Sequence, residues 1–304
     1  MKNPENRQNN EDFDSLLKRE SPESQIKKVG IASAIDTREK SKQNNQPCQD
    51  AIFCDEKNGI AIVCDGMGGH TAGDVASNLA CKSIAEKLEV FPNNLENSKK
   101  YMANVLEQVN KEIRNEAKTD LSKFDMGTTA SVVKIWQSEG ERKAIIGNVG
   151  DSRVYIINRE GNLTQITLDD NQARGDYNDQ DTEQLAIIKA IQEKLSSFTD
   201  ESEFTADDIR YYRFRNIISQ ALGMQGEISP HVDVVDVNNG DRLFICSDGI
   251  SDNLTNRQIE QILSASANRD EAVKKLIAEA KKVSLDISNK RHNDDDMSAV
   301  LIEV

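Results

Sequence analysis

Two short segments of the sequence place an aspartate directly after an apolar run. Residues 60–66 read Ile-Ala-Ile-Val-Cys-Asp-Gly, and residues 243–249 read Leu-Phe-Ile-Cys-Ser-Asp-Gly. Runs of this length and composition are typical of buried strands, so Asp65 and Asp248 are expected at strand ends. Asp-Gly after a strand is also an ordinary turn, and for either segment alone the turn is the simpler interpretation.

Further aspartates occupy similar places and change that balance. Asp151 follows the run 145–150, Asp50 opens another apolar run, and Asp294–Asp296 stand directly before the last one. Carboxylates at the ends of several strands can converge at one edge of a sheet, where they repel each other unless a cation lies between them. Ligand sets made only of oxygen suit Mg²⁺ or Mn²⁺ better than zinc or copper. Two such ions can activate a water against a phosphorus atom.

Glycines beside the first aspartate support the same chemistry. The segment Asp65–Gly73 holds four glycines within eight residues of the acid. Gly66 would let the backbone approach an ion closely enough for its carbonyl to act as a ligand. A phosphate-binding loop of the Walker type is excluded because no lysine follows the glycines. Neither Gly-x-Ser-x-Gly nor Cys-x₅-Arg occurs, which argues against a serine or cysteine hydrolase.

The overall composition excludes several classes of partner. The 304 residues carry a formal net charge of −14. This charge argues against nucleic acid and against an anionic membrane surface as partner. The five cysteines form no Cys-x-x-Cys pair and there are only three histidines, so a zinc site is not expected. Unpaired cysteines, with no signal peptide and no apolar run of membrane-spanning length, predict a cytoplasmic protein.

The chain divides into a polar tail and one large domain. Residues 1–28 lack apolar periodicity and are expected to be a disordered tail. Residues 29–304 are expected to form one domain, with a polar segment at about 170–212 that we interpret as a flap. The strands predicted from apolar runs are Val29–Ile35, Ala51–Cys54, Ile60–Cys64, Thr128–Trp136, Lys143–Val149, Arg153–Asn158, Leu163–Leu168, His231–Val237, Asp241–Cys246 and Met297–Val304.

Helical periodicity predicts the remaining elements. The helices expected from it are about Ala72–Leu88, Ser98–Lys118, Thr182–Leu195 and Phe214–Ala221, and residues of about Asn256–Val283 are expected to form a helical C-terminal part. The hairpin signal Lys57-Asn58-Gly59 joins the second and third strands. Tight connections among the middle strands predict antiparallel neighbours. Runs of strands, then helices, then strands indicate an α+β layered domain.

Six motifs in order resemble those of the metal-dependent Ser/Thr protein phosphatases of type 2C in their bacterial form. The resemblance covers roughly residue 29 to the C-terminus. The matching motifs are Asp65-Gly66-Met67-Gly68-Gly69-His70, Gly127-Thr128-Thr129, Gly147-Asn148-Val149-Gly150-Asp151-Ser152-Arg153, Ile218-Ser219-Gln220-Ala221-Leu222-Gly223, Cys246-Ser247-Asp248-Gly249 and Asp295-Asp296-Met297-Ser298.

This resemblance implies a fold and an activity. The fold would be a central sandwich of two antiparallel sheets with helices outside, in four αββα layers. The activity would be hydrolysis of phosphoserine or phosphothreonine in a protein by a water activated by two Mn²⁺ or Mg²⁺ ions. The implied partners are a phosphorylated protein and a cognate Ser/Thr kinase. Two alternatives stay open: a catalytically weak binding or regulatory module on the same fold, and a hydrolase of small phosphate esters.

The resemblance also implies residue roles. Asp65 would bridge the two metals and the Gly66 carbonyl would be a ligand. Asp248 and Asp295 would bind one metal, Asp50 would help to hold the other, and Asp151 would bind a third, weaker ion. Within this set, Asp65, Asp248 and Asp295 are the residues expected to carry catalysis.

The main departure from the family pattern concerns the residue that binds the substrate phosphate. The arginine usually found about five residues before the N-terminal acid is Asn45 here, which leaves Arg38 and Lys42 as candidates to bind the substrate phosphate. Lysine would act as a point charge without the fork of arginine. The usual asparagine after the last-strand acid is Asp296, so the ligand within Asp294–Asp296 stays open.

Smaller departures and the histidines complete the sequence-based picture. The frequent Asp-His pair of the family is Asp169-Asp170 here, and Tyr211-Tyr212 at the flap end are expected to pack the flap. We expect a structural role for His70. His231, at the start of a strand, and His292, in a charged loop, are not expected to act in catalysis.

Overall fold

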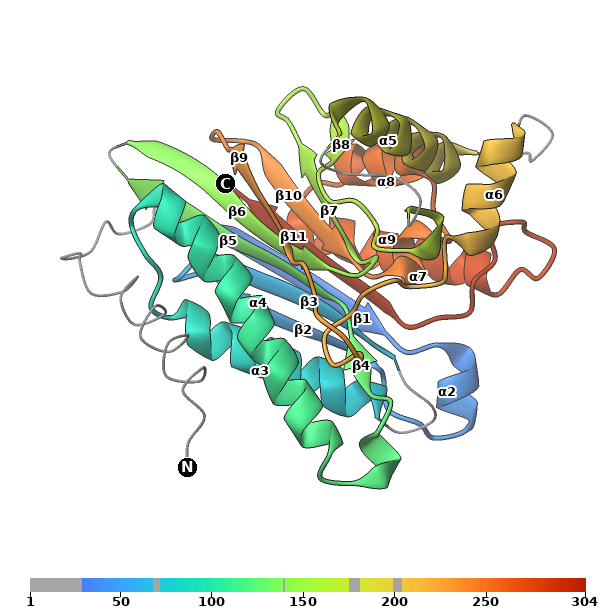
Figure 1. Ribbon diagram of the computed structural model, residues 1–304. Coiled ribbons are helices and arrows are strands. Elements are labelled where there is room, and N and C mark those ends of the chain that lie inside the picture. Colours follow the sequence, from blue (N-terminus) through green and yellow to red (C-terminus); the bar gives the residue numbers. More distant parts are fainter. Residues whose placement is uncertain (1–28, 68–71, 139, 175–180, 199–203) are drawn as a thin grey trace.

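Two antiparallel sheets pack face to face, with helices on both outer faces (Figure 1). The computed structural model describes residues 29–67, 72–138, 140–174, 181–198 and 204–304. The interpretations of residues 1–28 and of His70 therefore lie outside the described residues. The four layers match the α+β sandwich expected from the sequence.

Each sheet pairs strands that lie far apart in the sequence. The first sheet runs β1-β11-β10-β7-β8, comprising β1 (Gly30–Asp36), β11 (Met297–Glu303), β10 (Arg242–Cys246), β7 (Arg153–Ile157) and β8 (Leu163–Gln165). The second runs β2-β3-β5-β6-β9, with β4 beside β3, comprising β2 (Asp50–Asp55), β3 (Ile60–Met67), β4 (Gly127–Thr128), β5 (Ala130–Ser138), β6 (Glu141–Val149) and β9 (His231–Asp236).

Helices bury the outer face of each sheet. Two long helices, α3 (Gly73–Leu88) and α4 (Leu95–Ala117), cover the second sheet. The first sheet is covered by α7 (Asp248–Ser251), α8 (Asn256–Ala265) and α9 (Arg269–Ser284). The remaining helical segments are α2 (Glu39–Gln43), η1 (Leu121–Lys123), η2 (Gln172–Arg174), α5 (Thr182–Ser197) and α6 (Ala206–Phe214).

Strand β3 shows why its sequence is continuously apolar rather than alternating. Ile60 and Ile62 pack in the cluster below α3 and α4, whereas Ala61 and Val63 pack in the cluster between the sheets. Successive side chains point to opposite faces of a strand, so a strand in the middle of four layers is buried on both. The predicted hairpin that leads into β3 is confirmed, with Gly59 at φ +62°.

The connection between β6 and β7 corrects one sequence-based expectation. These strands were expected to pair because only three residues separate them. Instead β6 belongs to the second sheet and β7 to the first, so the chain crosses the sandwich at Gly150. Gly150 adopts φ +101°, and a β-carbon there would lie 2.6 Å from Thr129 Cγ2. A short connection therefore joins layers here, and it brings Asp151 to the edge shared by both sheets.

The segment before β9 corrects a second expectation. A helix was expected at about Phe214–Ala221, but helix α6 ends at Phe214 and the chain continues as turns and isolated bridges. One bridge pairs Leu222 with Thr128, beside β4. Leu222 at the end of this stretch packs in the cluster below α3 and α4, whereas Phe214 and Ile217 are exposed. Strand β8 is also shorter than predicted, ending at Gln165.

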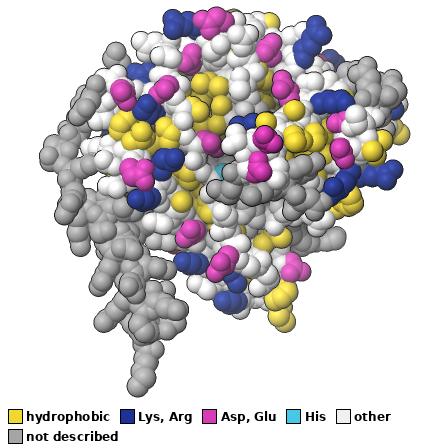
Figure 2. Space-filling view, turned by 45° about the horizontal axis from the view of Figure 1, so that its top comes forward, with side chains coloured by type: hydrophobic (Ala, Val, Ile, Leu, Met, Phe, Trp, Pro, Cys, Tyr) yellow, Lys and Arg dark blue, Asp and Glu magenta, His cyan; other side chains and the backbone are white. Residues whose placement is uncertain are grey.

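The surface carries charges of both signs. Figure 2 shows acidic and basic side chains interspersed on one face, and the described residues there form no continuous basic area. Within the described residues, none of the helices is both long and apolar enough to cross a membrane.

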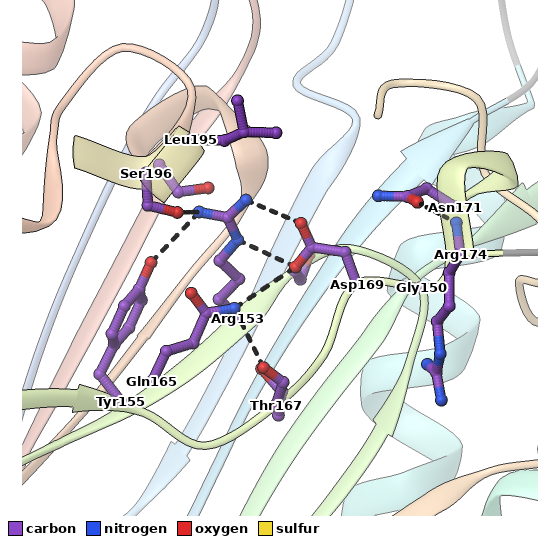
Figure 3. Close-up of polar contacts among 12 residues, drawn as sticks. Gly150, Arg153, Tyr155, Gln165, Thr167, Asp169, Asn171, Arg174, Leu195 and Ser196 are labelled. Atoms are coloured by element: carbon purple, nitrogen blue, oxygen red, sulfur yellow. Dashed lines mark hydrogen bonds and ion pairs between the residues drawn. The ribbon is translucent and has the colours of Figure 1, made fainter. Parts of the chain in front are cut away.

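The described part of the expected flap is attached to the sandwich by a buried ion pair (Figure 3). Arg153 Nε and Nη2 donate to the two carboxylate oxygens of Asp169 at 2.9 and 2.7 Å. Arg153 Nη1 also donates to Ser196 Oγ on helix α5 at 3.2 Å. A second arginine, Arg291, donates to the Leu195 carbonyl on the same helix at 3.1 Å. Two arginines of the main domain thus hold α5.

We predict that Asp169→Asn lowers the free energy of unfolding by about 3–5 kcal/mol, because it leaves the buried Arg153 guanidinium without its counter-charge. Urea unfolding followed by circular dichroism measures the change. The matched control is Glu160→Gln in the exposed Arg159–Glu160 pair, which should change stability little. Equal effects of the two substitutions would contradict this account.

Candidate metal centre

Strands β2 and β3 place the first two aspartates opposite each other. Asp50 pairs with Asp65 across the ladder, and Asp50 is 4% exposed. The Asp65 backbone is fixed by Thr129, between β4 and β5, since the Asp65 N–H donates to Thr129 Oγ1 at 3.0 Å and the Asp65 carbonyl accepts from the Thr129 N–H at 2.8 Å. These bonds leave the Asp65 carboxyl at the end of a strand that cannot shift independently.

The other sheet contributes the remaining aspartates. Asp248 begins α7 directly after β10, and Asp295 stands two residues before β11, the neighbour of β10. Gly249 lets these two segments meet, because a β-carbon there would lie 2.0 Å from the Asp296 carbonyl oxygen. Gly66 has the same function beside Asp65: a β-carbon there would lie 2.1 Å from the Gly73 carbonyl oxygen. The glycine of each Asp-Gly motif thus permits close backbone packing.

The predicted metal-binding aspartates form one electrostatic cluster. Burial raises the pKa of Asp65 well above its usual value, and the charges of Asp50, Asp248, Asp295 and Asp151 raise it further. Burial likewise raises the pKa of Asp248 well above its usual value, with the charges of Asp295 and Asp151 adding to the effect. The structure therefore brings together the five carboxylates that the sequence singled out.

The other members of the cluster are shifted in the same direction. Burial raises the pKa of Asp50 to about 7, although the nearby hydroxyls of Ser298 and Ser247 oppose the rise. Burial raises the pKa of Asp295 to about 6. Burial and the charge of Asp169 raise the pKa of Asp151 to about 8. Buried carboxylates that raise each other's pKa need an external cation before all of them can ionise.

Unpartnered oxygens show where a cation would fit. Among the described residues, the Oδ1 atoms of Asp50, Asp151 and Asp248 are buried and accept no hydrogen bond. Hard divalent cations bind such carboxylate oxygens. In the described segments, no three acidic, cysteine or histidine side chains already surround one point as a finished ligand set. The buried, unpartnered oxygens of Asp50, Asp151 and Asp248 are therefore the observation that favours divalent ions.

The structure distinguishes the three consecutive aspartates. Asp296 is 2% exposed, and its two oxygens accept the backbone N–H groups of Arg38 and Gln49 at 2.7 and 2.6 Å. Its carboxylate is thus engaged with the backbone. Asp295, in contrast, faces the other acids and lies 3.7 Å from Arg38 Nη1. The charges of Asp295 and Asp296, rather than Asp294, are among the main causes that raise the pKa of Asp50.

The two candidate phosphate-binding side chains have different surroundings. Arg38 Nη2 donates to Gln49 Oε1 at 3.2 Å, and Arg38 Nη1 lies at 3.7 Å from Asp295, so the guanidinium borders the carboxylate cluster. Lys42 Nζ instead pairs with Asp36 at 2.6 Å and with Glu39 at 3.3 Å. Of these two side chains, Arg38 is therefore the one that lies beside an aspartate of the cluster.

One acidic residue was missed by the sequence analysis. Asp252 raises the pKa of Asp248, Asp151 and Asp295, and its Oδ2 is buried with no hydrogen-bond partner among the described residues. It lies four residues after Asp248, so a short helix beginning at Asp248 puts both carboxyls on the same face. That spacing was the available signal, but the helix α7 was not predicted.

Asp170, His231 and Tyr212 make contacts that hold neighbouring segments together. Asp170 Oδ1 accepts from Arg174 Nη1 at 2.9 Å and lies 2.9 Å from His231 Nε2, while Asp170 Oδ2 accepts from the Gly150 N–H at 3.0 Å. His231 thus helps to hold the crossing between the sheets. Tyr212 packs against Phe198 at a ring distance of 5.2 Å, in agreement with its expected role in the flap.

Comparisons with known proteins agree on one family. A family model described as "Protein phosphatase 2C" matches residues 39–283. The chain is 28% identical over 250 residues to "Serine/threonine phosphatase stp" of Listeria innocua, which covers 82% of this chain and 85% of the relative. It is 27% identical over 207 residues to "Protein phosphatase PhpP" of Streptococcus pneumoniae, which covers 68% of this chain and 73% of the relative.

Solved structures share the fold. Serine/threonine phosphatase Stp1 from Staphylococcus aureus superposes with a TM-score of 0.70 at 23% identity, covering 94% of this chain and 99% of that one. The catalytic domain of the serine/threonine protein phosphatase PstP, in complex with two manganese ions, superposes with a TM-score of 0.64 at 23% identity, covering 91% of this chain and 98% of that one. These likenesses confirm the sandwich architecture.

We predict that the metal-free protein becomes less stable as the pH rises from 5 to 8. The raised pKa values of Asp295, Asp50 and Asp151 mean that the folded chain binds more protons than the unfolded chain in this window, so stability falls with pH. In EDTA, the Tm at pH 8 should be lower than the Tm at pH 5 by roughly 5 °C or more. A loss of 1 kcal/mol in the free energy of unfolding lowers the Tm of a large domain by about 2–4 °C.

The counterpart measurement uses Mn²⁺. Thermal unfolding with Mn²⁺ should show a larger rise in Tm at pH 8 than at pH 5.5, because protons compete with the ion for the same oxygens. Asp50→Asn in the metal-free protein should flatten the pH dependence. A Tm that is constant or rises with pH in EDTA would refute the mutual repulsion inferred for the cluster.

Proposed function

The chain belongs to the protein phosphatase 2C family, and on that basis we propose that it hydrolyses phosphoserine and phosphothreonine in proteins. The observation that carries the proposal is the buried carboxylate cluster at the edge shared by both sheets, with Arg38 beside it. The names of the Listeria and Streptococcus relatives support the substrate class. The substrate is then a phosphorylated protein, with a Ser/Thr kinase as the source of the phosphate.

The cofactor we infer is a pair of Mn²⁺ or Mg²⁺ ions. Asp65 would hold both, Asp248 and Asp295 one of them, and Asp50 with the Gly66 carbonyl the other. The manganese complex of PstP supports this number of ions. When bound, the two ions would lower the pKa of a water between them and neutralise charge that develops on the phosphate. Asp151, beside Asp252, is our candidate for a third, weaker site.

Arg38 is the group we assign to the substrate phosphate. A guanidinium offers parallel N–H donors that match two phosphate oxygens. Its edge already borders Asp295, which places those donors next to the ions that the cluster would hold. Lys42 is not proposed for this task, because its ammonium group is paired with Asp36 and Glu39.

The main argument for a catalytically weak binding module was the missing phosphate-binding arginine. The position of Arg38 weakens this argument, and the presence of all the predicted carboxylates weakens it further. All five cysteines are free, which suits a reducing compartment, and we infer a cytoplasmic location from them. Comparing phosphopeptides with nucleotides as substrates would separate a protein phosphatase from a hydrolase of small esters.

We predict that Asp65→Asn and Asp248→Asn each reduce Mn²⁺-dependent hydrolysis of p-nitrophenyl phosphate by more than roughly a hundredfold, because a direct ligand matters at least as much as the groups that orient ligands. Circular dichroism should show an unchanged fold. Asp236→Asn, which alters an exposed carboxylate on β9, is the matched control and should retain full activity. Wild-type activity that persists in EDTA would rule out the proposed chemistry.

A further inference from the structure

The connection between β1 and β2 is closed by one buried side chain. Residues 37–49 contain helix α2, and the two flanking residues Arg38 and Gln49 both donate their backbone N–H to Asp296. The first bond reaches Oδ1 at 2.7 Å and the second reaches Oδ2 at 2.6 Å. Both are at the short end of N–H···O distances, as expected for bonds to a carboxylate. Asp296 thereby fixes both ends of the connection.

Gln49 also binds the Arg38 side chain. Its Oε1 accepts from Arg38 Nη2 at 3.2 Å, and its backbone carbonyl accepts from the Gly66 N–H at 3.1 Å. Gln49 therefore links the guanidinium to the strand end that follows Asp65. On the other side, Arg38 Nε donates to Ser41 Oγ at 2.8 Å, within the same connection.

We propose that Asp296 and Gln49 are positioning residues that hold the Arg38 guanidinium beside the carboxylate cluster, ready to bind the substrate phosphate. The inference rests on the proposed function and deepens it. An arginine side chain has many rotamers, and a fork held in place before binding loses less freedom when phosphate arrives. Arg38 lies between β1 and helix α2 and belongs to neither element, so the direction of its side chain depends on these individual hydrogen bonds.

The chemistry of residue 296 makes the inference testable. A carboxylate presents acceptors on both sides, as two converging N–H groups require. An amide of nearly the same size presents one acceptor and one donor, so Asp296→Asn would leave one N–H facing another donor. Asp294→Asn removes the same charge two residues away, and the Asp294 carboxylate makes no hydrogen bond within the described part of the chain. It is therefore the matched control for charge.

The experiment titrates inorganic phosphate into the Mn²⁺-saturated full-length protein by isothermal calorimetry, after Mn²⁺ binding has been measured for each variant. We expect Asp296→Asn to weaken phosphate binding about tenfold, the size of effect that follows from losing one bond to a charged group. Asp294→Asn should stay within about twofold of the wild type. In an Arg38→Ala background, Asp296→Asn should have no further effect on the Kd for phosphate.

Kinetics supply a readout that a purely structural role would not give. Asp296→Asn should raise the KM for p-nitrophenyl phosphate with a much smaller change in kcat. A loss of phosphate affinity that adds to that of Arg38→Ala would overturn the inference. So would a loss of Mn²⁺ binding with unchanged phosphate binding to the loaded protein. Wild-type protein that binds phosphate through Arg38 but hydrolyses no ester would instead contradict the proposed function alone.

Gln49→Leu keeps the inference testable if Asp296→Asn does not fold. This substitution retains the backbone N–H to Asp296 and removes only the acceptor for Arg38 Nη2. It should weaken phosphate binding by a smaller factor than Asp296→Asn, and this effect should also vanish in the Arg38→Ala background. Wild-type phosphate affinity in Gln49→Leu would contradict the assigned role of Gln49.

Discussion

Repulsion between buried carboxyl groups is the constraint on which the site depends. Asp65 lies where the charges of four other aspartates raise its pKa, and these residues come from both sheets. Such an arrangement is unfavourable in a protein without ions, so the rest of the fold must supply the stability that keeps it in place. The continuous apolar strands and the buried clusters on each side of the sheets supply it. The site is thus arranged to be stabilised by cations.

Backbone packing explains why the aspartates cannot move apart. Gly66 and Gly249 lie so close to neighbouring carbonyl groups that no side chain fits at either position. The ladder between β2 and β3 fixes Asp50 opposite Asp65, and Ser247 Oγ donates to Asp50 Oδ2 at 2.7 Å. Hydrogen bonds to the ionised form offset part of the repulsion. The acids are thereby held on rigid elements, which is the requirement for a metal centre with defined geometry.

The sequence predicted most of the elements that carry the aspartates, because apolar runs report burial directly. The segments around Asp65, Asp248 and Asp295 were all predicted as strand ends, and the structure has them there. It did not predict that β6 and β7 belong to different sheets, since loop length alone does not show whether a chain turns back or crosses over. The helix expected at Phe214–Ala221 does not form, because the tertiary bridges of Ile218 with Asn171 and of Leu222 with Thr128 override local periodicity.

The choice between Arg38 and Lys42 shows a second limit of sequence. Both are cations before Asp50, and spacing along the chain cannot separate them when an inserted helix changes the path. The structure separates them through their partners. Lys42 and Lys281 share Asp36 and Glu39, which ties α2 to α9. Lys42 is therefore engaged between α2 and α9, whereas Arg38 Nη1 lies beside Asp295 of the cluster.

The proposed metal ligands and the proposed phosphate-binding group are therefore held by different kinds of structure. The acids stand at strand ends, where regular pairing and apolar burial define their positions. Arg38 stands on a connection, where position depends on a few individual hydrogen bonds, chiefly those to Asp296. Asp296 nevertheless adjoins Asp295 and packs against Gly249, so it belongs to the same strand end as two acids of the cluster. Through this one carboxylate the connection is aligned with the elements that position the acids.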